Sequence, residues 1–524
     1  MNEITFDLSR PALPVRREHV RMGGTNPRGE TISVTSHYLE WNGQPWLPIM
    51  GEFQYSRHPC RYWEEGLRKI HAAGVEIVPT YVLWNHHEEV EGVFDWSEDR
   101  DLRRFVELCQ RVGFCVVLRM GPFCHGEALN GGLPDWLYGQ PFEARSNDPR
   151  YLRLAKRLYG EIAQQIRGLT FAEGGPIIGI QCDNEYDDSA APWETTFIPG
   201  TEFTPKGSGG AEHLLTLKRY AAEAGISVPL YTATGWGATT PIIPEEFLPM
   251  YGGYAFFAWL DDPASQGPSG FLVFRDQHRR AHPRFDPATV PFACCEIGGG
   301  IQPFYRNRPH VPPESVEAMH VVQLGSGSNI MGYYVFHGGT NPTGKHSFLN
   351  EHRCPRKSYD FQAPIREFGQ LNASYHRLRR QFLFLRSWGA QLATMETALE
   401  IGELVKPEDT TRVRAALRTD GESGFIFVSN YQDHVEMREH LQVRFRVGDL
   451  SIPATGYATV QRDACAILPV GMWVGAIRLI SATVAPLTRL QVDGVEHIFF
   501  RSQPGFTASF VIDVQSLAQP GADQ

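Results

Sequence analysis

The chain has 524 residues, which is more than one hydrophobic core usually holds, so one large domain and a smaller one are expected. Hydrophobic residues make up 42% of the sequence, and 59 acidic against 49 basic side chains give a net charge of -10. This charge balance argues against a polyanionic partner such as nucleic acid.

The N-terminal segment and the cysteines indicate a cytoplasmic protein. The first ten residues lack the basic start and the apolar core of a secretory signal, and no apolar run approaches the length of a membrane span. The nine cysteines form no CxxC pair, so reduced thiols are the simplest interpretation. We therefore expect a cytoplasmic protein with no membrane partner, and its oligomeric state stays open.

Strand-like and helix-like segments alternate over most of the chain. Asn42-Gly43 separates two strand-like runs and predicts a tight hairpin, because both residues tolerate positive φ. The apolar patterns predict strands at residues 48–54, 75–84, 114–119, 176–185, 229–234, 250–259, 290–296 and 329–336. They predict helices at residues 61–73, 99–112, 149–166, 210–224, 270–281, 313–324 and 365–386.

Eight strands separated by helices are typical of a closed (β/α)8 TIM barrel, in which the chemistry lies where the strands end. From about residue 392 onward the segments are β-prone with turns between them, which predicts a smaller C-terminal antiparallel β domain. We therefore expect an α/β protein. Residues 1–390 would form the barrel catalytic domain with its N-terminal hairpin, and residues 391–524 a β-sandwich-like accessory domain.

Two of the predicted strands end in a glutamate. The fourth strand finishes in Asp183-Asn184-Glu185, and the seventh finishes in Cys295-Glu296. A buried strand offers no water to a carboxylate, so each glutamate either faces solvent or is held for chemistry. Because two strands of one barrel repeat the pattern, chemistry is favoured.

Paired carboxylates across a barrel mouth are suited to glycoside hydrolysis. One carboxyl group must be protonated to help the leaving oxygen depart, while the other stays ionised to attack the anomeric carbon. A retaining enzyme would hold the carboxyl groups of Glu185 and Glu296 about 5 to 5.5 Å apart. Asn184 could hydrogen-bond a sugar hydroxyl beside the reacting carbon.

A series of short motifs runs through residues 45–370. They are 51–57 (GEFQYSR), 80–88 (TYVLWNHHE), 118–123 (LRMGPF), Glu127 with 131–137 (GGLPDWL), 145–149 (RSNDP), 174–178 (GGPII), 184–186 (NEY), 336–341 (FHGGTN) and 358–364 (SYDFQAP). In this order the motifs resemble those of glycoside hydrolase family 35, the β-galactosidases of the (β/α)8 clan. No single motif carries the resemblance.

The resemblance implies a retaining exo-β-glycosidase that releases terminal non-reducing β-D-galactosyl residues by double displacement. Glu185 would be the acid/base and Glu296 the nucleophile. The remaining residues that the resemblance assigns to the sugar pocket are Tyr81, Glu127, Asn184 and Tyr334. An oligosaccharide or glycoside would be the substrate, and no metal or organic cofactor is implied.

The residues alone also allow simpler interpretations of the pocket. Glu127 could cap a helix or pair with an arginine, and the two tyrosines could pack in the core. Other signals are weak: the segment 339–346 nearly forms a phosphate-binding loop, but His346 stands where Ser or Thr is needed. His86 and His87 lack the helical spacing that places two imidazoles on one metal.

Three positions depart from the family pattern. Gly298 stands where an aromatic residue is usual, Phe361 where a tyrosine is common, and Ala128 where a tryptophan is usual. Each change removes bulk or a hydroxyl group from the expected pocket, so the preferred sugar stays open. The alternatives are a glycosidase or transglycosylase for another β-linked sugar, or a catalytically silent carbohydrate-binding relative.

Overall fold

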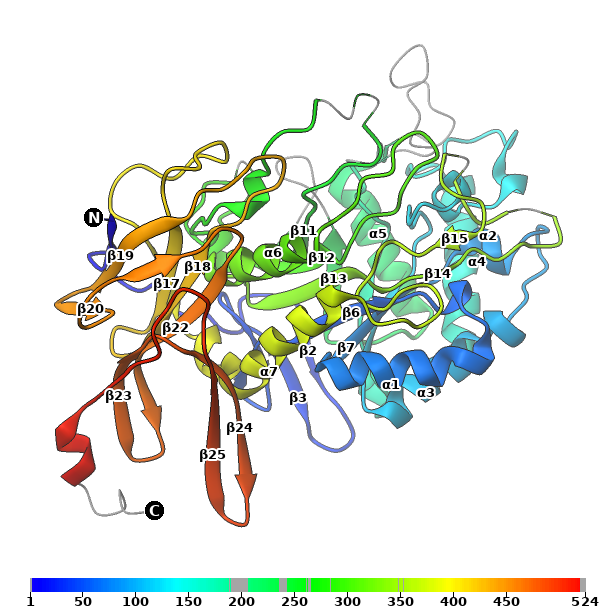
Figure 1. Cartoon of the computed structure of the whole chain (residues 1–524). Coiled ribbons are helices and arrows are strands. Elements are labelled where there is room, and N and C mark those ends of the chain that lie inside the picture. The colour runs from blue at the N-terminus through cyan, green and yellow to red at the C-terminus, as the bar shows by residue number, and fades with distance from the viewer. Residues whose placement is uncertain are drawn as a thin grey trace.

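The structure is a computed structural model that describes residues 2–187, 189, 206–234, 243–260, 262, 265–282, 284–346, 348–351 and 353–518. Eight parallel strands close into a barrel, which confirms the predicted (β/α)8 fold (Figure 1). The barrel strands are β6 (Ile49–Phe53), β7 (Ile77–Tyr81), β8 (Cys115–Arg119), β9 (Ile177–Gln181), β10 (Leu230–Thr234), β11 (Leu248–Gly253), β12 (Ala293–Gly298) and β13 (Ile330–His337).

The barrel strands are continuous apolar runs in the sequence, which fits strands that are buried on both faces. Every residue of β6, β7, β9 and β13 is buried, as expected for parallel strands with side chains inside and helices outside. β13 pairs with β6 and closes the barrel. Glu185 follows the fourth barrel strand and Glu296 lies on the seventh, as the sequence predicts.

Helices cover the outside of the barrel. Those described are α1 (Trp63–Ala73), α2 (Trp84–His87), α3 (Leu102–Val112), α4 (Pro149–Gln165), α5 (Gly210–Glu223), α6 (Pro313–Gly325) and α7 (Ala373–Ala393). α3 ends at Gly113, whose φ of 104° is the left-handed conformation of a helix C-cap. Residues Ser315–Gly325 of α6 are all buried, because α6 lies between the barrel and the C-terminal strands (Figure 1).

The N-terminal hairpin differs in part from its prediction. Asn42 and Gly43, with φ of 52° and 72°, make the expected turn, but it joins β4 (Leu39–Trp41) to β5 (Gln44–Trp46). The first strand-like run of the predicted hairpin, residues 32–41, is divided into β3 (Thr31–Val34) and β4, because the Thr35 hydroxyl accepts hydrogen bonds from two following backbone N–H groups and turns the chain. A short strand β2 (Gly23–Thr25) pairs with β3.

The helix predicted at residues 270–281 is wrong. In this segment only Gly270–Leu272 forms a short 3₁₀ turn, with Ser269 accepting a hydrogen bond from the N–H of Phe271. Backbone N–H groups that an α-helix would use internally are engaged elsewhere: Arg275 donates to the Ser326 hydroxyl at 3.1 Å and Gln277 donates to the Ser326 carbonyl at 3.2 Å. The chain is therefore held against the end of α6 in an irregular path.

The last predicted helix begins later and ends later than expected. Asn372 caps α7 by accepting a hydrogen bond from the N–H of Ala373, so the helix starts eight residues after the predicted Ile365. Ile365 instead forms isolated β-bridges with His337 and Leu371. Nearby, β14 (Gly339–Thr340) pairs with β15 (Ser358–Tyr359).

The C-terminal region is antiparallel β structure, as predicted. One sheet contains β16 (Glu396–Leu399), β17 (Arg414–Thr419), β18 (Gly424–Ser429), β22 (Cys465–Val474), β23 (Ile477–Ala482) and β26 (Phe510–Ile512). The other elements are β19 (His440–Val447), β20 (Leu450–Ile452), β21 (Ala458–Val460), and the hairpin of β24 (Ala485–Val492) and β25 (Val495–Arg501).

The N-terminal strand belongs to this C-terminal region. β1 (Asn2–Thr5) pairs in parallel with β19, so the start of the chain joins a sheet of the C-terminal region (Figure 1). The division of the chain into domains at residue 390 stays a prediction. Within the described residues, no helix is both long enough and apolar enough to cross a membrane.

Candidate active site

A cavity of about 330 Å³ opens where the barrel strands end. Its volume falls in the range of small-ligand sites. All six residues that the sequence analysis assigned to the site line this cavity: Tyr81, Glu127, Asn184, Glu185, Glu296 and Tyr334. The structure therefore brings together residues from five separate barrel strands and the loops that follow them.

The loop after β9 aims Glu185 into the cavity. Asp183 and Glu185 have φ of 57° and 43°, a left-handed conformation that non-glycine residues seldom adopt and that often marks functional sites. The buried Arg145 side chain holds this loop by donating to the Asp183 carboxylate at 2.7 Å and to the carbonyl of Asn184 at 3.0 Å. Glu185 also accepts a hydrogen bond from the Ser189 hydroxyl.

Arg119, the last residue of β8, contacts two carboxylates at the mouth of the barrel, those of Glu52 and Glu296. Its guanidinium donates to Glu52 at 2.5 Å and forms an ion pair with Glu296. It also donates to the side-chain oxygen of Asn184 at 2.9 Å, and it lies 4.0 Å above the centre of the Tyr81 ring. Glu296 and the Glu185 loop are thus positioned by one cation.

The electrostatics of this cluster depend on its burial. Burial opposes the charge of Arg119, but the carboxylates of Glu52 and Glu296 outweigh it and hold the pKa of Arg119 well above its usual value. Burial raises the pKa of Glu52, and the charge on Arg119 counters that rise. The cluster combines two carboxylates with one guanidinium, so Glu296 can carry a negative charge in a water-poor site.

A second chain of hydrogen bonds holds Glu127. The Tyr359 hydroxyl donates to the Glu127 carboxyl group and lies 2.7 Å from the Tyr334 hydroxyl, which in turn accepts a hydrogen bond from Gln54 at 3.0 Å. Burial raises the pKa of Glu127 to about 7, although the bond from Tyr359 lowers it. Among the described residues, Glu127 neither caps a helix nor forms an ion pair, and it lines the cavity.

Tyr81 and Tyr334 both pack in the core and line the cavity. Their rings meet edge to face with centroids 6.2 Å apart, in an apolar cluster under the cavity. Core packing and pocket lining are therefore both true of these two residues. Their pKa values are raised well above normal by burial, so both hydroxyl groups stay protonated.

The three departures from the family pattern have structural counterparts. A side chain at Gly298 would meet the Tyr254 ring at 2.8 Å, so Tyr254 occupies the space that a larger residue at position 298 would need. The Tyr254 hydroxyl lies 3.4 Å from the Glu296 carboxylate. Phe361 is fully buried and packs edge to face on Tyr334. Ala128 is buried beside Glu127.

Four residues at the site are not predicted from the sequence: Arg119, Glu52, Tyr359 and Tyr254. A signal for the first two was present, because each is an ionisable residue at or near the end of a predicted apolar strand, as Glu185 and Glu296 are. Tyr359 lies in the short strand β15, and Tyr254 follows β11 within the segment 250–259 that is predicted as a strand, so strand patterns do not indicate the contacts of either residue. These contacts join positions far apart in the chain.

The described residues contain no group of three or more His, Cys, Asp or Glu side chains arranged to hold a metal ion. His87 stacks on Trp96 with centroids 4.1 Å apart and lies 2.6 Å from the Tyr55 hydroxyl. Burial lowers the pKa of His87 to about 4, so the ring is neutral at pH 7. His87 is therefore a core residue.

Comparisons with known proteins identify similar sequences and structures. The model of glycosyl hydrolases family 35 matches residues 38–201 and 266–383. A β-galactosidase of Canis lupus familiaris is 30% identical over 352 residues, which are 67% of this chain and 48% of that protein. A β-galactosidase of Felis catus is 31% identical over 345 residues, 64% of this chain and 46% of that protein.

The crystal structure of the β-galactosidase from the psychrophilic Marinomonas ef1 shares 13% identity with a TM-score of 0.43, covering 66% of this chain and 62% of that one. This chain spans about half the length of the curated relatives that it matches.

Proposed function

This chain belongs to glycosyl hydrolases family 35, and on that premise we propose that it is a retaining exo-β-glycosidase that hydrolyses terminal non-reducing β-D-galactosyl residues. The observation that carries the proposal is that Glu185 and Glu296 line one cavity, with Arg119 paired to Glu296. Neither a metal nor an organic cofactor takes part in the proposed reaction.

The proposed reaction has two displacements. In the first, the Glu296 carboxylate attacks the anomeric carbon, the bond to the leaving oxygen breaks, and Glu185 donates its proton to that oxygen. In the second, Glu185 takes a proton from water, the water oxygen attacks the anomeric carbon, and the bond to Glu296 breaks. The carboxyl separation of about 5 to 5.5 Å that this mechanism needs stays a prediction.

The contacts of Glu296 are suited to a nucleophile. Arg119 places a positive charge against one carboxylate oxygen, and the Tyr254 hydroxyl lies 3.4 Å from the other. Ser189 donates a hydrogen bond to a Glu185 oxygen. The two carboxyl groups thus have different partners, as different roles require.

Glu127, Asn184, Tyr81 and Tyr334 would bind the sugar. They present a carboxyl group, an amide and two hydroxyl groups to a cavity that is otherwise apolar, which is the arrangement of a site specific for a polar ring. Two relatives that share 30 and 31% identity with the chain are named β-galactosidases, which supports galactose as the sugar.

The pocket changes support a second candidate, a glycosidase or transglycosylase for another β-linked sugar. Phe361 offers no hydroxyl group beside Tyr334 and Tyr359, and Tyr254 occupies the space next to Gly298. Assays of a panel of aryl β-glycosides, with analysis of the products, distinguish the two candidates. A carbohydrate-binding relative without activity would bind sugars but turn over none of the panel.

Replacement of either glutamate tests the proposed roles. We expect Glu296→Gln and Glu185→Gln to lower kcat/KM on an aryl β-galactoside by about 10³-fold or more, whereas Glu64→Gln, on the exposed face of α1, should leave it unchanged. Azide should partly restore turnover of an activated substrate by Glu185→Ala, because this small anion replaces the missing base-activated water. The assigned roles of Glu185 and Glu296 would be rejected if kcat/KM fell by less than tenfold in both glutamine variants, or if azide had no effect.

A further inference from the structure

Among the residues that the structure describes, no helix covers the outer face of the barrel between β11 and β12. Over the described part of residues 254–292, the regular structure is limited to the 3₁₀ turns Gly270–Leu272 and Pro287–Thr289. A (β/α)8 barrel normally places a helix at this point. The irregular chain that replaces it arches over the strands and encloses a cavity of about 560 Å³.

This outer cavity is separate from the candidate active site. Met250 and Cys295 point into the barrel core, while Pro249 and Tyr251 of β11 face outward and line the outer cavity. Phe271 stands in the wall of both cavities. The outer cavity therefore lies on the other side of the β11–β12 wall from Glu296.

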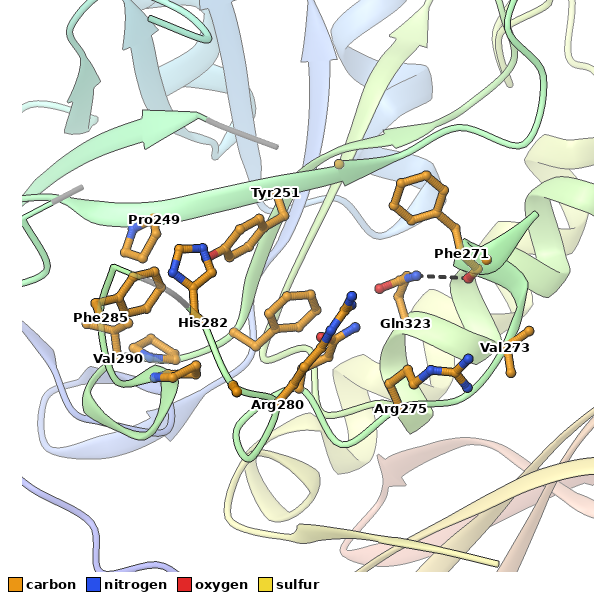
Figure 2. A pocket seen from close by; sticks show the side chains of 17 residues that line it. Pro249, Tyr251, Phe271, Val273, Arg275, Arg280, His282, Phe285, Val290 and Gln323 are labelled. Atoms are coloured by element: carbon orange, nitrogen blue, oxygen red, sulfur yellow. Dashed lines mark hydrogen bonds between the residues drawn. The ribbon is translucent and has the colours of Figure 1, made fainter. Parts of the chain in front are cut away.

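Aromatic rings and cations share the lining of the outer cavity (Figure 2). Tyr251 and Phe292 stack with centroids 5.3 Å apart at an angle of 22°. Figure 2 shows Arg280 between the end that carries His282 and Phe285 and the end that carries Phe271 and Gln323. Such a surface offers flat apolar faces on which a ring can pack, with donor groups beside them.

The two arginines of this cavity lack acidic partners. Arg275 is half-buried and donates to the carbonyl of its neighbour Phe274 at 2.8 Å, and Arg280 is exposed; neither forms an ion pair with a carboxylate of the described residues. Burial lowers the pKa of Arg275, and the positive charge of Arg280 adds to this effect. The positive charges of Arg275 and Arg280 thus repel each other, although the net charge of the protein is -10.

We propose that the outer cavity is a binding site for a ring-shaped ligand that carries a carboxylate, sulfate or phosphate group. The anionic group would lie between Arg275 and Arg280, where it relieves their repulsion and accepts their N–H groups. The ring would pack on Tyr251 and the phenylalanines. An acidic sugar and an aryl phosphate share this chemistry, and the site is independent of the hydrolysis proposed above.

Isothermal titration of the full chain with three probes tests the proposal: galacturonate, phenyl phosphate and inorganic phosphate. We expect at least one ring-bearing anion to bind, with an affinity that falls about tenfold or more in Arg275→Gln/Arg280→Gln. The exposed Arg280→Gln alone should weaken binding about threefold without a risk to folding. Tighter binding of galacturonate would assign a sugar ring, and tighter binding of phenyl phosphate an aryl ring.

The matched control is Arg68→Gln/Arg462→Gln, which removes the same charge from α1 and from the C-terminal region. This control should bind the probes as the unmodified protein does. The proposal is overturned if neither ring-bearing anion binds at 10 mM, if the two double variants bind alike, or if inorganic phosphate binds as tightly as both ring-bearing anions. Thermal melting of each variant checks that the fold is intact.

Discussion

Arg119 at the mouth of the barrel and Arg418 at the junction with the C-terminal sheet are both buried, with 2% and 0% of their surfaces exposed. Their partners differ in kind. Arg119 meets two carboxylates, and its pKa lies well above the usual value. Arg418 donates to backbone carbonyls and to the Asn329 side chain, and burial lowers its pKa to about 9.

Two of the carbonyls bound by Arg418 come from the ends of two barrel helices. Its guanidinium donates to the carbonyl of Leu324 in the last turn of α6 and to that of Leu392 in the last turn of α7. Unsatisfied carbonyls and the negative end of the helix dipole accumulate at these positions. Arg418, on β17, therefore caps two helices at once and fastens the sheet to the barrel.

The difference shows what a buried cation does in each region. At the mouth, opposite charges surround Arg119, so a charge that develops on Glu296 or is lost from it during a reaction is compensated nearby. At the junction, fixed dipoles hold Arg418, and no group beside it needs to change its charge. We infer that Arg119 serves chemistry and Arg418 serves assembly.

Replacing Arg119 should give the largest effect on activity. In Arg119→Gln, Glu52 stays buried without its cation and Glu296 loses its partner, so we expect kcat/KM to fall about 10³-fold and the free energy of unfolding to fall by about 3 kcal/mol. Steady-state kinetics and urea denaturation measure the two effects. Adding Glu52→Gln should restore much of the stability but not the activity. Activity within tenfold of the unmodified protein would contradict a role in chemistry.

Replacing Arg418 should affect stability without affecting the reaction. Arg418→Met leaves several buried carbonyls unpaired, so we expect the free energy of unfolding to fall by about 3 kcal/mol while kcat/KM of the folded protein stays within twofold. Urea denaturation followed by far-UV circular dichroism measures the loss. Arg462→Gln, an exposed change, is the control. A large fall in kcat/KM at full folding would remove the distinction between the two arginines.

The barrel and the glutamate pair were predictable because their signals are local. Each barrel strand is a short apolar run. The polar residues at the ends of the runs that contain β9 and β12, Glu185 and Glu296 among them, differ clearly from those runs. Alternation of strands and helices then fixes which residues share the mouth. Glu185 and Glu296 could be placed in one cavity by this reasoning alone.

The remaining features depend on contacts between distant segments. The helix predicted at 270–281 fails because Ser326, some fifty residues later, takes the N–H group of Arg275. Tyr359 reaches Glu127 across 232 positions of sequence. The pairing of Arg119 with Glu52 joins two strand ends whose separation the sequence does not encode locally. Such partners follow from tertiary packing, which overrides local propensity.

Glu127 refines the comparison, because it is a buried carboxyl group at the mouth that Arg119 does not contact. Its pKa of about 7 in the folded protein exceeds the 4.5 of an exposed glutamate, so between these values the folded state binds more protons than the unfolded state. Stability must therefore fall as the pH rises from about 4.5 to about 7. Over this range we expect the unmodified protein to lose about 3 kcal/mol more than Glu127→Gln.

Urea denaturation at a series of pH values measures this difference, and subtraction of the Glu127→Gln curve removes the contributions of other buried groups such as Glu52. Tyr359→Phe is the matched variant: the Tyr359 hydroxyl lowers the pKa of Glu127, so its removal should shift the loss of stability to higher pH. Parallel curves for the unmodified protein and Glu127→Gln would mean that Glu127 stays ionised throughout, and that the mouth stabilises a carboxylate even where Arg119 does not pair with it.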